Sequence, residues 1–284
     1  MHLTVEQIVW ALVLTGHLVL LVVLLGRDRI SRFPWFTAAI AVSTVHLIAD
    51  HLLHGKLTMV DFYWQSYGAI LLEAILGLLV LAELARRVFS NCKSGLILNA
   101  TGWLGWSLVT VCVAIGAVWL WGPWPSWNKL NEDPKQLPLL LVVLCGMKGQ
   151  HFLALLTVEV GLLLAIFGKR FGSGLRSHPQ LIMLGLSTYA LGFLAVQATT
   201  DIIKHTVHLT SREQYEHIVR LFSNLDNGRF ALWFLVLVWW IVWLWRNDPA
   251  DPAGELVEVP VLAGPPPLET HTEIEPETPP DAEN

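Results

Sequence analysis

Seven apolar runs, each about as long as a membrane-spanning helix, constrain this chain more than any other feature of its sequence. A helix needs about 20 apolar residues to cross roughly 30 Å of hydrocarbon. Such runs fall near residues 6–25, 35–54, 67–87, 99–121, 149–168, 179–200 and 229–246. Hydrophobic residues make up 54% of the 284 residues and charged residues only 14%. The sequence therefore predicts an all-α integral membrane protein, a bundle of about seven transmembrane helices within residues 1–246.

Basic residues between the runs predict the orientation of the bundle. Ten of them follow the first, third, fifth and seventh runs: Arg27, Arg29, Arg32, Arg86, Arg87, Lys93, Lys169, Arg170, Arg176 and Arg246. The acids near them are Asp28 and Glu83, whereas Lys and Arg are mixed with many acids at the other ends of the runs. By the positive-inside rule the basic side is cytoplasmic, which gives an N-out, C-in protein. We expect it in a bacterial cytoplasmic membrane, with the lipid bilayer as its first partner.

Residues 247–284 differ sharply from the rest of the chain. They contain ten acids and no Lys or Arg, while residues 1–246 carry a net charge of +5. The segment is rich in proline and almost free of aromatic residues, so it cannot bury enough apolar area to fold. We expect a disordered acidic cytoplasmic tail, which could bind a cytoplasmic protein partner.

Residues 43–59 place titratable side chains inside the second run. His46, Asp50 and His54 recur every four residues and so lie on one helical face. Such groups are costly in a bilayer unless they meet each other, a partner helix, water or a ligand. Other runs bring ionisable side chains to a similar depth in the outer leaflet. The candidate outer-leaflet polar pocket consists of His46, Asp50, His54, Glu73, Lys148, His151, Asp201 and His205.

Three interpretations of this pocket stay open at the level of sequence. His46, His54, His151 and Glu73 are ligand types for a metal ion, and His46 or His17 opposite His151 could hold haem. Alternating histidines and acids could also line a proton or ion path. The structural interpretation pairs these groups between helices, for example Asp50 with Lys148 or Lys204. No cofactor follows from the spacing, because HxxxDxxxH is not a recognised metal motif.

Segments that flank the runs carry further predictions. The apolar run 137–145 is too short to cross alone, so it either lengthens the fifth span or forms a re-entrant piece. Residues 210–222 predict a separate amphipathic helix that lies on the outer membrane surface or covers the bundle as a lid, with Thr210 and Glu213 as its capping box. Two clusters of tryptophans predict interfacial belts, an outer belt of Trp119, Trp121, Trp124 and Trp127 and an inner belt near residue 240. Those of the inner belt are Trp239, Trp240, Trp243 and Trp245.

No motif assigns an activity. The sequence has no phosphate-binding loop, no dinucleotide fingerprint and no nucleophile elbow, and its three cysteines lack metal-type spacing. The basic residues follow from topology, so nothing indicates nucleic-acid binding. We therefore expect a non-enzymatic receptor-like or scaffolding role. The alternatives are a membrane component that binds a metal, haem or small molecule at the outer-leaflet pocket, and a transporter or proton path.

Three patterns carry a loose resemblance to other proteins. They are the Arg32-Phe33-Pro34-Trp35-Phe36 start of the second span, a third span with an early acid and the basic ending ELARR, and a glycine-rich sixth span. From Arg32 to about Thr200 the chain thus resembles a group of uncharacterised bacterial multi-pass membrane proteins. The resemblance implies a helical membrane bundle and no activity.

Overall fold

The computed structural model describes residues 4–53, 55–90, 100–121, 124, 136–167, 177–207 and 211–247, and these form helices joined by turns without a strand. They all belong to one unit of the chain, Met1–Ala250. The second unit, Asp251–Asn284, is not among the described residues. The helices are α1 (Val5–Gly26), α2 (Pro34–Leu53), α3 (Met59–Ser90), α4 (Ala100–Leu120), α6 (Leu137–Phe167), α7 (His178–Thr206) and α8 (Arg212–Trp245). The prediction of an all-helical protein is confirmed for this part of the chain.

Six of the helices in the described ranges are long and apolar enough to cross a membrane. They are α1, α2, α3, α6, α7 and α8, with lengths from 20 to 34 residues. The predicted span 99–121 corresponds to α4. The apolar stretch of α4, Val109–Leu120, is shorter than the apolar part of any of the six long helices. The prediction of a multi-pass membrane protein is thus confirmed, while the seventh span stays a prediction.

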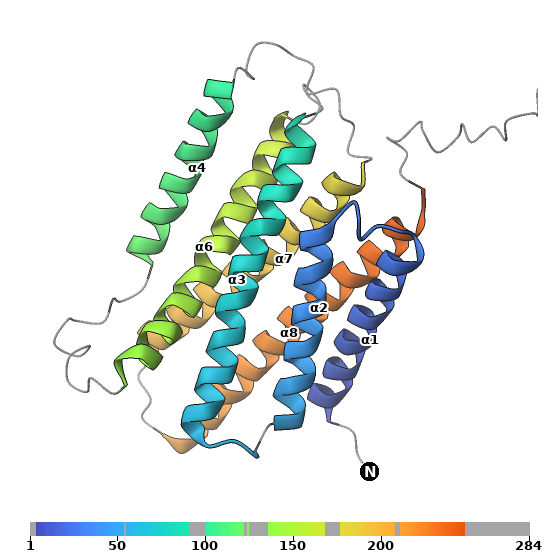
Figure 1. The fold of residues 1–284 in the computed structure, drawn as a ribbon. Helices are drawn as coiled ribbons and strands as arrows, with labels where there is room; N and C mark the ends of the chain where they lie inside the picture. The colour runs from blue at the N-terminus through green and yellow to red at the C-terminus, as the bar shows by residue number, and fades with distance from the viewer. Residues whose placement is uncertain are drawn as a thin grey trace, which may run out of the picture. The chain divides into compact units, whose positions relative to one another are not determined.

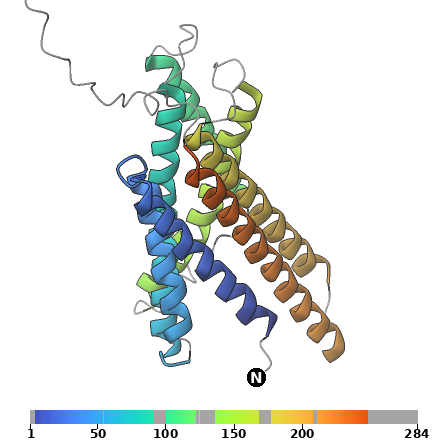
Figure 2. The same cartoon turned by 90° about the vertical axis from the view of Figure 1, so that its right-hand side faces the viewer.

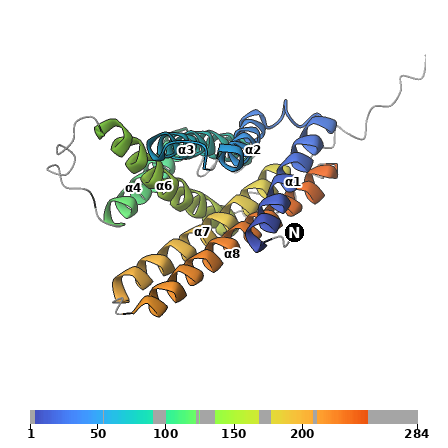
Figure 3. The same ribbon diagram turned by 90° about the horizontal axis from the view of Figure 1, so that it is seen from below.

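The six long helices follow one another around a closed ring. Each packs against two neighbours in the order α1, α2, α3, α6, α7 and α8, and α8 returns to α1 (Figure 3). Helix α3 also meets α7 across the ring. Within the described residues α4 packs only on α6, and Figure 1 shows it outside the ring. The sequence does not predict this order, because the contact between α1 and α8 joins helices from opposite ends of the chain.

Apolar packing is densest toward one end of the ring, where α1, α3 and α8 end and α2 begins. Fully buried side chains there include Leu24, Phe36, Leu84, Met183 and Leu244. We call this the arginine-rich end, since Arg27, Arg29, Arg32, Arg86, Arg87 and Arg246 lie at these helix ends. The Glu83 carboxylate lies near the backbone N–H groups of Trp35 and Phe36 in the first turn of α2. Glu83 also accepts a hydrogen bond of 3.2 Å from Arg87.

Trp240 does not belong to an interfacial belt, and that prediction is wrong. Its side chain is 0% exposed and packs edge-on against Phe36, with 5.1 Å between the ring centroids. The reason is helical spacing: Leu237, Trp240 and Leu244 share the face of α8 that turns toward the core. Trp239 and Trp245 lie on other faces and are exposed, as a belt requires.

Two flanking segments are parts of long helices. Residues 137–145 belong to α6, so the alternative that lengthens the fifth span is the one observed. Residues 212–222 are continuous with the last span in α8, and the prediction of a separate surface helix is wrong. Ser211 caps α8 by accepting a hydrogen bond of 3.2 Å from the Gln214 backbone N–H. Packing of α8 along α7 overrides the turn-forming residues between Phe222 and Arg229.

Candidate functional site

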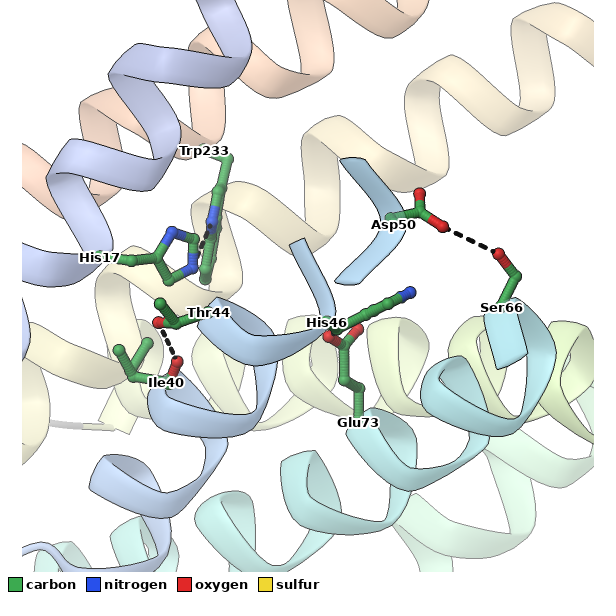
Figure 4. Close-up of polar contacts among 8 residues, drawn as sticks. All are labelled: His17, Ile40, Thr44, His46, Asp50, Ser66, Glu73 and Trp233. Atoms are coloured by element: carbon green, nitrogen blue, oxygen red, sulfur yellow. Dashed lines mark hydrogen bonds and ion pairs between the residues drawn. The ribbon is translucent and has the colours of Figure 1, made fainter. Parts of the chain in front are cut away.

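A polar contact between α2 and α3 lies at the centre of the candidate site. The His46 Nδ1–H group donates to Glu73 Oε1 at 3.0 Å, which makes an ion pair when the imidazole is protonated (Figure 4). The two side chains are 17% and 26% exposed. A charge-assisted hydrogen bond in such a poorly hydrated place is stronger than one at the surface. The contact therefore joins α2 to α3 through two titratable side chains.

Asp50 lies one turn farther along α2 from His46. One of its carboxylate oxygens accepts a hydrogen bond of 3.3 Å from the Ser66 hydroxyl on α3. The predicted pairing of Asp50 with Lys148 or Lys204 is not observed. Lys148 donates instead to the Trp121 carbonyl, and Lys204 lies over the Phe222 ring. Asp50 thus adds a second polar link between the same two helices.

His17 is the most deeply buried polar residue near this contact, with an exposure of 1%. Its Nδ1–H group donates to the Val13 carbonyl at 2.9 Å. Trp233 on α8 donates its Nε1–H group to His17 Nε2 at 3.3 Å. These partners define a neutral imidazole with its proton on Nδ1 and its Nε2 lone pair occupied. His17 can therefore ligate a metal or haem iron only after it loses Trp233.

The His46–Glu73 and His17–Trp233 contacts belong to one group inside the ring. The Glu73 carboxylate is near enough for its charge to act through space on His17 and on Tyr189 of α7. Tyr189 packs against Trp233 with ring centroids 4.6 Å apart. We call this group the interior polar cluster; it consists of His17, His46, Glu73, Tyr189 and Trp233. Helices α1, α2, α3, α7 and α8 each contribute one member.

Three of the remaining predicted pocket residues, Lys148, His151 and Asp201, lie in a separate group around Trp121, which we call the Trp121 group. Trp121 donates its Nε1–H group to Asp201 at 3.2 Å, and Lys148 donates to its carbonyl. The His151 ring lies 5.6 Å from both the Trp121 and Phe193 rings. The predicted single pocket is thus divided in two, with His205 exposed at the end of α7 and His54 outside the described residues.

The described part of the chain contains no group of three or more His, Cys, Asp or Glu residues that could hold a metal ion. His151 donates its Nδ1–H group to the Met147 carbonyl at 2.8 Å and packs between aromatic rings of its own group. His46 and His17 belong to the interior polar cluster, so the haem pairs expected from the sequence, His46 or His17 with His151, are split between the two groups. The geometry offers two adjacent ligand-type groups, His46 and Glu73, which suit a proton or a polar organic ligand.

An aromatic column extends from the interior polar cluster toward the arginine-rich end. Trp233 meets Trp240 edge-on with centroids 5.4 Å apart, and Trp240 meets Phe36. Tyr189, Ser66 and Trp233 are partners in the site that the sequence did not predict. The seven-residue spacing of Trp233 and Trp240 is the signal that could have found the column, because it places both rings on one face of α8.

The comparisons with known proteins find no matching family model, no matching curated protein and no matching solved structure. The resemblance to uncharacterised bacterial multi-pass proteins stays a prediction. The function must therefore be argued from the chemistry of the interior polar cluster.

Proposed function

We propose that the chain is a seven-span protein of a bacterial cytoplasmic membrane, with α4 as the seventh span. The arginine-rich end faces the cytoplasm in this proposal, which makes the N-terminus external and the acidic tail cytoplasmic. Six described arginines at that end support the orientation, since the acids there are Asp28 and Glu83. At the opposite end basic residues mix with Asp61, Asp201, Glu213 and Glu216.

We propose a receptor-like role, in which the interior polar cluster responds to a small polar ligand or to protons from outside. The observation that carries this proposal is the convergence of five helices on His17, His46, Glu73, Tyr189 and Trp233. A ligand that takes up Glu73 or His46 competes with the 3.0 Å contact that joins α2 to α3. Ligand binding would then favour a different arrangement of α2 and α3, as a receptor requires.

The aromatic column supports transmission to the cytoplasmic end. At the outer end of the column Trp233 contacts His17. At the other end Trp240 contacts Phe36 in the first turn of α2. A shift of Trp233 therefore displaces groups packed at the ends of α2 and α8. The tail continues from α8, so a cytoplasmic partner bound to the tail would sense this displacement.

The test measures whether the interior polar cluster controls the distant helix ends. Spin labels at Arg32→Cys and Asn247→Cys, in a chain with its three cysteines replaced by serine, report the distance between α2 and α8 in nanodiscs. We expect Glu73→Gln to shift the measured distance distribution, because it weakens the contact with His46. The control Glu216→Gln removes the acid of an exposed ion pair. The Arg212 side chain of this pair is 91% exposed and the Glu216 side chain is 55% exposed. This control should leave the distribution unchanged.

An unchanged distribution in a folded Glu73→Gln protein would contradict the receptor-like role. The cofactor alternative is tested separately by an absorbance spectrum and elemental analysis of the purified protein. Haem absorbance or a stoichiometric metal would replace the receptor-like proposal with that alternative.

A further inference from the structure

Two arginines lie at neighbouring helix ends on the arginine-rich side of the ring. Arg27 follows the last residue of α1, and Arg246 follows the last residue of α8. These two helices pack against each other, and Figures 1 and 2 show the two ends close together. The chain thus brings basic residues 219 positions apart to one corner of the bundle.

A buried arginine fixes this corner. Arg29 is 7% exposed and donates from Nη2 to the Arg246 carbonyl at 3.3 Å. The Arg27 guanidinium lies over the Trp245 ring at 4.9 Å, and the Arg246 guanidinium lies over the Trp243 ring at 5.1 Å. Cation–π contacts of this kind orient the guanidinium planes without neutralising their charge.

The corner has a surplus of positive charge. Arg27 and Arg246 are both exposed, and neither forms an ion pair within the residues that the structure describes. Asp28 is the acid beside Arg27 in the sequence, and it forms no ion pair in the described residues either. The acid that follows Arg246 in the sequence, Asp248, lies outside the described residues. Both guanidinium groups keep their positive charge at this corner, and an anion bound beside them would offset it.

Apolar surface leads from the two arginines along both helices. On α1 the exposed residues Leu18, Val22 and Leu25 are spaced four and three positions apart, and on α8 Val238, Val242 and Trp245 have the same spacing. This spacing makes one stripe on each helix. Tryptophan rings favour headgroup depth, so Trp243 and Trp245 place the guanidinium groups at the level of lipid phosphates.

We propose that this corner binds the headgroup of an anionic phospholipid. Arg27 and Arg246 donate hydrogen bonds to the phosphate oxygens, and the apolar stripes of α1 and α8 contact the acyl chains. Arginine suits this role because its planar group binds phosphate in a bidentate way. A free inorganic anion would leave the stripes unused, which is why a lipid fits the corner better.

The test uses the full chain, purified in detergent and given equal amounts of phosphatidylglycerol and phosphatidylcholine. Native mass spectrometry then measures the ratio of the two lipids in the singly bound state. We expect wild-type protein to prefer phosphatidylglycerol, and Arg27→Gln with Arg246→Gln to lower the ratio. Each basic residue near an anionic surface contributes about a fivefold change in affinity. The single variants should each lower the ratio by about that factor.

A matched control removes two charges from the opposite end. Lys56→Gln with Arg212→Gln changes two exposed basic residues there, and we expect the wild-type ratio to persist. The proposal is overturned if the wild-type protein shows no preference, or if both double variants change the ratio equally. If the double variant loses its cooperative melting transition, the single variants decide: an unchanged ratio in both also overturns the proposal.

Discussion

His17 shows what burial does to one polar residue in this bundle. Its two ring nitrogens are occupied by the Val13 carbonyl and by Trp233. His17→Phe would leave the Trp233 N–H group without an acceptor, and an unsatisfied buried donor costs about 1–3 kcal/mol. We expect this loss in the free energy of unfolding, measured by denaturant titration in detergent with circular dichroism. His205→Phe at the exposed end of α7 is the control, with a change below about 0.5 kcal/mol.

The His46–Glu73 contact can be measured by a double-mutant cycle. His46→Ala, Glu73→Gln and the double variant should give a coupling energy of about 1 kcal/mol, because the contact is largely shielded from water. The same cycle on Arg212 and Glu216, which are exposed at the start of α8, should give about 0.3–0.5 kcal/mol. Equal coupling in both cycles would show that burial adds nothing to the His46–Glu73 contact.

Part of the site could be predicted residue by residue. His46 and Glu73 were both expected in the polar pocket, because depth along a helix follows from about 1.5 Å of rise per residue. Their direct contact and the separation of the Trp121 group could not be predicted. These depend on which helices are neighbours and how each is rotated, and both are decided by packing of side chains from distant parts of the chain.

At the scale of the element, the contact between α7 and α8 leaves no room for a side chain at Gly185. A Cβ atom at Gly185 would lie 2.5 Å from Trp240 Nε1, and this ring is completely buried. We expect Gly185→Ala to lower the free energy of unfolding by about 1–3 kcal/mol through overpacking. The control Gly68→Ala meets no atom within 4 Å, so it should be neutral or stabilising by up to about 1 kcal/mol. Thermal unfolding in detergent measures both, and similar melting temperatures would contradict the expected clash.

The lengths of the elements were the least predictable part of the fold. Helix α8 has 34 residues and so measures about 51 Å, whereas the sequence placed only its second half in a span. Hydrophobicity identifies the part of a helix that crosses lipid, but it does not report where the helix ends. Polar residues such as Ser223 and Asn224 remain helical here because α8 packs along α7.

At the scale of the whole molecule, orientation is the property most directly open to test. In a chain with Cys92, Cys112 and Cys145 replaced by serine, Lys56→Cys should react with a membrane-impermeant maleimide on intact cells. Arg32→Cys should react only after the membrane is opened, because the arginine-rich end is expected in the cytoplasm. The opposite labelling pattern would invert the proposed topology.

Composition and run length were sufficient to predict a multi-pass helical protein, since long apolar runs in lipid must be helical. The ring order was beyond the sequence. Short loops require only that consecutive helices be close, and they say nothing of the contact between α1 and α8 or of the place of α4 outside the ring.

Closure of the ring between α1 and α8 has a consequence for biogenesis. The ribosome synthesises α1 before the other helices and α8 after them. The contacts of His17 with Trp233 and of Arg29 with the Arg246 carbonyl can therefore form only when translation is almost complete. Until then His17, which is buried in the folded protein, is exposed on α1 to lipid or to assembly factors. A chain truncated before α8 would lack both partners, and membrane quality control could recognise it by these unsatisfied groups.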